Sequence, residues 1–177
     1  MKLKKTIKNI LAIRHEETKE DLIKRGVKMG NNVNIYSCNI DQGHGFLVEI
    51  GDNVTITHSV ILTHDASTKN ALGYSKVGKV KIGNNVFIGY GSIILPGVQI
   101  GNDVIIGAGT VVRENIPDNS VAIGNPAQIA CNTNEYLEKN RKRMKHVPVY
   151  ETYWKDKTEK EKKQMVEELD ETIGFDV

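Results

Sequence analysis

The feature that most constrains this chain is a repeat of six residues that runs from Ile82 to Ile116. In each repeat the first residue is aliphatic, the fifth is small or β-branched, and glycine often stands second. The first positions are Ile82, Ile88, Ile94, Ile100, Ile106 and Val112. A period of six fits neither the helical period of about 3.6 nor the two-residue alternation of a strand. It predicts short strands separated by regular corners, with the first residue of each strand facing inward.

Three such segments close a coil of eighteen residues, because "IGNNV" at residue 82 recurs as "IGNDV" at residue 100. Related strings begin at Met29 and Ile50, and the same phase holds at Ile56 and Leu62. The wider spacings upstream predict a small insertion after Ile35 and a large one after Leu62. The expected fold is an all-β solenoid of about four to five coils, which stack because no coil buries its inner face alone.

The flanks of the repeat have helical patterns. We expect an N-terminal helical cap over residues 1–28, the β-helix over 29–131 and a C-terminal helical segment over 132–177. Residues 4–24 carry apolar side chains at helical spacing, with Gly26 as a stop. Thr158 with Glu161 forms a predicted capping box. Such helices are expected to cap the ends of the solenoid.

The composition excludes several classes of function. The formal net charge is only +2, so bulk charge favours neither a nucleic acid nor a membrane surface as partner. Cys38 and Cys131 are too few for a disulfide framework, and no apolar run reaches transmembrane length. The first residues are basic but lack a secretory cleavage pattern. We expect a cytoplasmic protein with no membrane insertion.

The repeat, the "THD" before a long loop and the closing "IPDNSVAIGNPAQI" resemble the hexapeptide-repeat acyltransferases. The chain is similar in particular to the maltose, galactoside and capsular-sugar O-acetyltransferases. This resemblance implies a left-handed parallel β-helix and a homotrimer with active sites between neighbouring subunits. It also implies acetyl-CoA as co-substrate, a sugar or glycan hydroxyl as acceptor, and no required metal.

His64 is the predicted catalytic residue. It stands where the regular repeat stops, before a loop over residues 65–80, and precedes Ile82 by eighteen residues. In the family that the chain resembles, the catalytic histidine holds this place. An imidazole suits a general base because its unperturbed pKa lies near neutrality. The alternative is a polar residue at a solenoid corner.

The acceptor-binding candidates are Asn39, Asp41, His44 and Asp65. Asn39, Asp41 and His44 lie in an irregular stretch one coil before His64, where the family often places an acidic acceptor-binding residue. Asp41 is otherwise a turn-forming residue. Asp65 either orients the histidine or starts the loop.

The coenzyme-binding candidates are Phe87, Gly89, Tyr90, Gly107, Ala108, Arg113 and Asn125. The resemblance places the pantetheine arm against backbone groups of the glycine corners, with an aromatic residue at Phe87. The sequence departs from the family pattern at the phosphate end. Glu114 holds the usual lysine position and Gln128 replaces a later basic residue, so Arg113 or a base from 139–145 is expected to compensate.

Three alternatives remain open from the sequence. The first is an N-acyltransferase of a nucleotide-linked amino sugar. The second is a zinc enzyme like the γ-class carbonic anhydrases, which needs three converging histidines. The third is a non-catalytic β-helix that serves as a scaffold or binding surface.

Overall fold

The computed structural model describes residues 17–177. The chain consists of two compact units, and the boundary between them in the sequence follows Thr133. The first unit is built from three parallel sheets. Sheet 1 has the order β1 (Lys28–Met29), β4 (Val48–Ile50), β9 (Val80–Ile82) and β12 (Gln99–Ile100). Sheet 2 has the order β2 (Asn34–Tyr36), β5 (Thr55–Thr57), β10 (Phe87–Ile88), β13 (Ile105–Ile106), β15 (Ser120–Ile123) and the antiparallel β16 (Gln128–Asn132). Sheet 3 has the order β3 (Asn39–Ile40), β6 (Val60–Ile61), β11 (Ile93–Ile94) and β14 (Val111–Val112).

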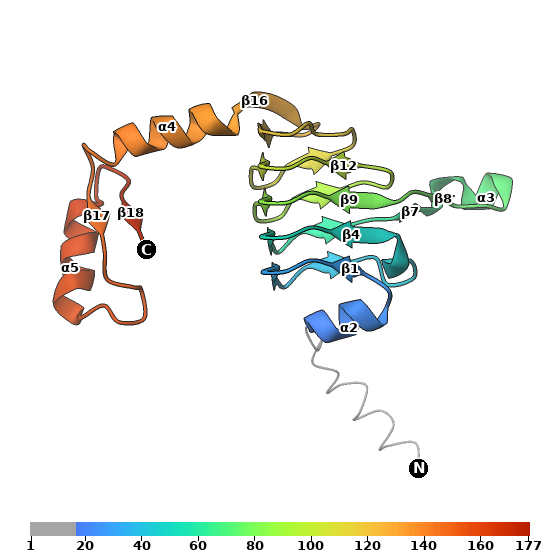
Figure 1. The fold of residues 1–177 in the computed structure, drawn as a ribbon, viewed down its shortest axis with the longest axis horizontal. Helices are drawn as coiled ribbons and strands as arrows, with labels where there is room; N and C mark the ends of the chain where they lie inside the picture. The colour runs from blue at the N-terminus through green and yellow to red at the C-terminus, as the bar shows by residue number, and fades with distance from the viewer. Residues whose placement is uncertain (1–16) are drawn as a thin grey trace, which may run out of the picture. The chain divides into compact units, whose positions relative to one another are not determined.

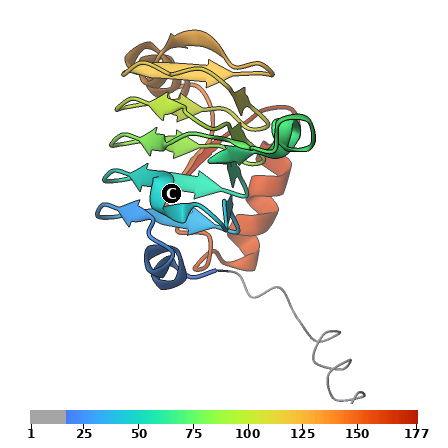
Figure 2. The same ribbon diagram turned by 90° about the vertical axis from the view of Figure 1, so that its right-hand side faces the viewer.

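Each coil contributes one strand to every sheet, so the chain visits sheets 1, 2 and 3 in turn and then climbs to the next coil (Figures 1 and 2). The register confirms the stacking that the sequence predicts, since Met29 pairs with Ile50, Ile50 with Ile82, and Ile82 with Ile100. The aliphatic side chains of these strands fill the interior, and Ile56, Ile88 and Ile106 are fully buried. Their burial is the main source of stability for the stacked coils.

The corner between sheets 1 and 2 explains the recurring "GNN" and "GND" strings. Backbone amides of one coil donate to side-chain oxygens of the next at 2.6–2.8 Å, in a column made of Asn31, Asp52, Asn84, Asn102 and Asp118. The following residues have left-handed backbones, with φ between 51° and 56°, at Asn32, Asn53, Asn85, Asp103 and Asn119. Asparagine and aspartate tolerate this conformation best after glycine. The repeat is therefore a hydrogen-bonded ladder as well as an apolar pattern.

The predicted phase is wrong by one residue at Leu62. Ile61, and not Leu62, pairs with Ile94 and is fully buried. The reason lies in the preceding corner, where three residues separate Ile56 from Val60 although four residues separate Ile88 from β11. In this short corner His58 adopts a left-handed backbone with φ of 44°.

Two excursions interrupt the coils, both at the corner between sheets 3 and 1. The first follows Ile40 and contains the 3₁₀ helix η1 (Gly45–Leu47). The second is an arm that follows the strand β6, and Figure 1 shows it projecting from the stack. The arm consists of β7 (His64–Asp65), η2 (Ala66–Thr68), α3 (Lys69–Leu72) and β8 (Lys76–Val77). β7 and β8 pair antiparallel, so the arm returns to the corner that it leaves.

The flanking helices are partly as predicted. α2 (Lys19–Lys24) lies below the first coil and buries Leu22 in the core, whereas the predicted helical pattern before residue 17 lies outside the described residues (Figure 1). The second unit contains most of α4 (Thr133–Arg143), then β17 (Val149–Tyr150), α5 (Glu159–Glu168) and β18 (Phe175–Asp176). The capping box of Thr158 and Glu161 is confirmed at the start of α5. A capping role of the second unit stays a prediction. Among the described residues, no helix has the length and apolar character needed to span a bilayer.

Candidate active site

His64 lies at the corner between sheets 3 and 1, at the first residue of the arm. Its neighbour Thr63 is fully buried, and the Thr63 carbonyl accepts a hydrogen bond of 2.8 Å from the amide of Gly78 at the other end of the arm. The His64 side chain is 41% exposed. The fold thus anchors the backbone of this histidine on a rigid strand end and leaves part of the imidazole accessible.

Asp41 lies one coil below, and its side chain is only 1% exposed. One carboxylate oxygen, Oδ2, contacts Nδ1 of His64 and accepts hydrogen bonds from Oγ1 of Thr63 at 2.7 Å and from its backbone amide at 3.2 Å. The other, Oδ1, accepts a bond of 3.1 Å from the Gly43 amide. Both oxygens therefore have partners within the protein, and the carboxylate faces His64.

These contacts fix the charge and the tautomer of the pair. Burial by itself raises the pKa of the Asp41 carboxyl, but hydrogen bonds from His64, Thr63 and Gly43 outweigh it and lower the pKa well below its usual range. An ionised carboxylate only accepts hydrogen bonds, so the Nδ1 of His64 must carry the proton. The Nε2 atom then holds a free lone pair. In the neutral imidazole this lone pair can accept a proton.

His44 approaches the same carboxylate. Its Nδ1 lies 3.8 Å from Oδ1 of Asp41, and its ring centroid is 5.3 Å from that of His64. Asp41, His44 and His64 each offer one ligand atom, and these atoms lie within 4.8 Å of one another, which is a spacing that could hold a metal ion. In this arrangement Nδ1 of His64 contacts the Asp41 carboxylate.

The remaining two acceptor-side candidates lie apart from this pair. Asp65 forms an ion pair of 2.5 Å with Lys76 and accepts a bond of 2.8 Å from the Ser67 amide. Lys76, followed by the contacts of Ser67, lowers the pKa of Asp65 to about 2. Asn39 lies on β3, where its amide donates to the Ser59 carbonyl, and it is exposed. Asp65 thus stabilises the start of the arm. The carboxylate that contacts the His64 imidazole is that of Asp41.

The predicted pantetheine residues gather at a different corner, between sheets 2 and 3. The Gly89 and Tyr90 corner stacks on that of Gly107 and Ala108, and a Cβ added to Gly89 would lie 2.7 Å from the Ala108 amide nitrogen. Tyr90 is 63% exposed and packs against His58 with ring centroids 4.7 Å apart. Phe87, on the strand β10, is 45% exposed. In one chain, this group and His64 occupy separate corners.

The two remaining coenzyme candidates lie at the upper end of the solenoid. Arg113 lines a hollow of about 240 Å³ together with Glu114, Pro126 and Gln128, and Asn125 directly precedes Pro126. Arg113 lies 3.6 Å from the Glu114 carboxylate. The two positions at which the sequence departs from the family pattern therefore share one hollow.

Sequence reasoning missed Thr63, whose hydroxyl and amide both hold Asp41. The predicted phase placed Leu62 inward and therefore Thr63 outward, so the sequence contained no indication of this buried contact. Sequence reasoning also missed Arg25, whose side chain donates to the carbonyls of Ile40 and Asp41. No repeat covers residue 25, so no pattern could have indicated that contact.

Comparison with known proteins agrees with the fold. Residues 79–114 match the family model described as bacterial transferase hexapeptide (six repeats). Protein CapG of Staphylococcus aureus is 40% identical over 153 residues, which cover 82% of this chain and 81% of CapG. The galactoside O-acetyltransferase of Lactococcus lactis is 44% identical over 91 residues, which cover 50% of this chain and 42% of that protein.

Two solved structures are similar over most of the chain. A maltose O-acetyltransferase from Clostridium difficile 630 has a TM-score of 0.53 and 32% identity, covering 74% of this chain and 82% of its own. A galactoside acetyltransferase in complex with coenzyme A has a TM-score of 0.53 and 26% identity, covering 68% of this chain and 72% of its own. These neighbours imply that the parallel β-helix is left-handed. The chain belongs to the bacterial hexapeptide transferases, and it is an acyltransferase.

Proposed function

We propose that this chain transfers the acetyl group of acetyl-CoA to a hydroxyl group of a sugar or glycan, with His64 as the general base. The observation that carries this proposal is the contact between the buried Asp41 carboxylate and Nδ1 of a partly exposed His64. The donor and the acceptor class are supported by the similarity to sugar O-acetyltransferases, one of which was solved with coenzyme A.

The chemistry requires only a positioned base and an activated acyl donor. Nε2 of His64 takes the proton of the acceptor hydroxyl while the oxygen forms a bond to the thioester carbonyl carbon. Asp41 stabilises the imidazolium that results, as in other Asp–His pairs. When the carbon–sulfur bond breaks, the imidazolium returns its proton to the departing thiolate. The thioester is already activated, so the proposal includes no metal.

The complete site is proposed to form between subunits of a homotrimer. In a single chain the base lies at the corner between sheets 3 and 1, and the predicted pantetheine residues lie at the corner between sheets 2 and 3. A rotational assembly brings one corner of a subunit against a different corner of its neighbour. His64 of one subunit would then face Gly89 and Gly107 of the next.

On the acceptor side, the proposal retains His44. Its side chain is 36% exposed and its ring lies beside that of His64, so it can contact an incoming hydroxyl-bearing ligand. Asp41 is assigned to orient the base because its carboxylate is buried and fully used by protein donors. We place the protein in the cytoplasm, where acetyl-CoA is made available.

The test is an acceptor screen with acetyl-CoA and the full chain. Thiol release is followed spectroscopically, and products from a panel of hexoses, glycans and nucleotide-linked amino sugars are read by mass spectrometry. The expected product is an acetyl ester that mild base removes. His64→Ala should abolish it, and His146→Ala, an exposed histidine of the second unit, should not. A stable amide product would favour the N-acyltransferase instead, and no product with any acceptor would favour a scaffold.

A further inference from the structure

At the lower end of the solenoid, backbone carbonyl groups of the first coil have no coil below them whose amides could donate hydrogen bonds. In the coils above, a sheet 3 amide donates to the carbonyl of the next coil: Asp41 to Ile61 at 3.0 Å, and Leu62 to Ile94 at 2.9 Å. Ile40 is the partner of Ile61 in this register, but it belongs to the first coil. Its carbonyl therefore needs a donor from outside the repeat.

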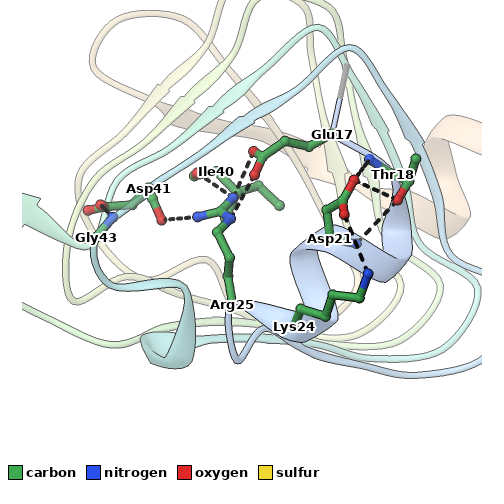
Figure 3. Close-up of polar contacts among 8 residues, drawn as sticks. All are labelled: Glu17, Thr18, Asp21, Lys24, Arg25, Ile40, Asp41 and Gly43. Carbon is green, nitrogen blue, oxygen red and sulfur yellow. Dashed lines mark hydrogen bonds and ion pairs between the residues drawn. The ribbon is translucent and has the colours of Figure 1, made fainter. Parts of the chain in front are cut away.

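Arg25 supplies that donor. One terminal nitrogen of its guanidinium donates to the Asp41 carbonyl at 2.8 Å, and the other donates to the Ile40 carbonyl at 3.1 Å (Figure 3). Glu17 holds the opposite edge, with its oxygens 2.7 Å from Nε and 2.8 Å from the second terminal nitrogen. The guanidinium is a rigid planar fork, so four contacts fix it in one orientation. At the Ile40 carbonyl, Arg25 thus takes the place of the amide that a lower coil would supply, and it binds the Asp41 carbonyl in addition.

The residue that Arg25 holds is also the residue that orients the base. The backbone of Asp41 is bonded upward through its amide to Ile61 and downward through its carbonyl to Arg25. Directly after Asp41 the chain leaves the regular coil for the segment that contains η1. From that side the carboxylate is held by the Gly43 amide, which donates to Oδ1 at 3.1 Å, and by no strand pairing among residues 17–177.

We infer that Arg25 is a positioning residue for acyl transfer, because it fixes the backbone of Asp41 and through it the orientation of His64. The inference rests on the proposed function. Arg25 itself lies below the first coil and contacts carbonyl groups and Glu17, not the imidazole. Its effect on the reaction is transmitted by the Asp41 carboxylate.

The first test compares Arg25→Lys and Arg25→Ala with wild type. Lysine keeps the charge but lacks the fork, so both variants are expected to lower kcat, by up to about 10²-fold, since small displacements of a catalytic group have effects of that size. The KM for acetyl-CoA should stay within a factor of about two, because the coenzyme candidates lie elsewhere.

The pH midpoint of kcat/KM should move to lower pH, since a carboxylate that no longer faces the imidazole stabilises the imidazolium less. Millimolar guanidinium should partly restore Arg25→Ala.

The matched control is Lys24→Ala, which removes an exposed cation at the last residue of α2, directly before Arg25; the Lys24 ammonium lies 3.9 Å from Asp21. It should leave kcat and the pH midpoint unchanged. A double-mutant cycle separates positioning from general destabilisation. If Arg25 acts through Asp41, adding Arg25→Ala to Asp41→Asn causes little further loss of kcat. Losses that multiply in full would overturn the inference.

A measurement that does not depend on enzymatic activity can test this inference independently of the proposed function. The imidazole nitrogen signals of His64, observed by NMR in ¹⁵N-labelled protein, report its tautomer and the pH at which it titrates. Both should change in Arg25→Lys and Arg25→Ala and stay as in wild type in Lys24→Ala. Unchanged His64 signals in folded Arg25 variants would contradict the inference, even if wild type transfers acetyl groups. A wild-type protein without transferase activity would contradict the proposed function alone.

Discussion

The carboxylate of Asp41 contacts Nδ1 of His64 although 23 positions separate the two residues in the sequence. They meet because Asp41 follows β3 in the first coil and His64 follows β6 in the second, and these strands are neighbours in sheet 3. The solenoid thus converts a long separation along the chain into contact between adjacent coils.

Replacement of the base is the most direct test of the site. His64→Ala is expected to lower kcat by about 10²–10⁴-fold, because it removes the group that takes the hydroxyl proton. The protein should stay folded with a lower melting temperature, because the buried Asp41 carboxylate loses one of its hydrogen-bond partners. Initial rates of thiol release at saturating acetyl-CoA give the measurement. Turnover within a few-fold of wild type would remove His64 from the mechanism.

The stability that Asp41 contributes should depend on pH. Its folded pKa is lowered below the unfolded value of about 3.9, so its contribution is complete above that value and declines as pH falls toward the folded pKa. The difference in unfolding free energy between wild type and Asp41→Asn should therefore shrink as pH is lowered from about 5 to 3. Urea titrations at one protein concentration measure it. A difference that grows on acidification would contradict the assigned charge state.

Arg113 is expected to contribute to coenzyme binding from the hollow that it shares with Gln128. Arg113→Ala should raise the KM for acetyl-CoA with a smaller effect on kcat, since the phosphate end is remote from the reacting atoms. The matched variant Glu114→Gln removes the carboxylate that lies 3.6 Å from Arg113 and should lower that KM. Equal KM values in all three proteins would leave coenzyme phosphate binding to other bases.

Mixed assemblies test whether sites form between subunits. His64→Ala lacks the base, and Ala108→Trp is expected to block the pantetheine corner, so each variant alone should be inactive. If one site combines both corners from different subunits, refolding the two variants together should restore activity at about a quarter of the sites. No recovery in verified mixed trimers would indicate that each chain carries a complete site.

Close stacking of the coils predicts a large effect of one added methyl group. A Cβ at Gly83 would lie 2.6 Å from the Gly101 carbonyl oxygen and 2.7 Å from its carbon, and backbone atoms of the next coil cannot rotate away. Gly83→Ala should therefore destabilise the protein by about 1–3 kcal/mol or more. Lys81→Ala, at an exposed position of β9, the strand that ends just before Gly83, should change stability by less than about 0.5 kcal/mol. Urea midpoints of the two variants compare them.

The sequence by itself determined the repeating part of the protein. Ile82 and Ile100 occupy equivalent positions in successive coils. Each coil must bury an aliphatic residue beside the asparagine ladder, so the same residue types recur along the sequence. Repetition makes such a requirement visible in a single chain. His64 could be predicted for a related reason, because it stands where that regularity stops.

Only the tertiary structure decided what lies against His64. The short corner before Val60 and the excursion after Ile40 change the register locally, so no period could predict the contact of Asp41 with His64, or those of Thr63 and Arg25 with Asp41. Each of these contacts occurs once in the molecule. A contact that does not recur in each coil produces no repeating pattern in the sequence, so it could be identified only from the stacked coils of the structure.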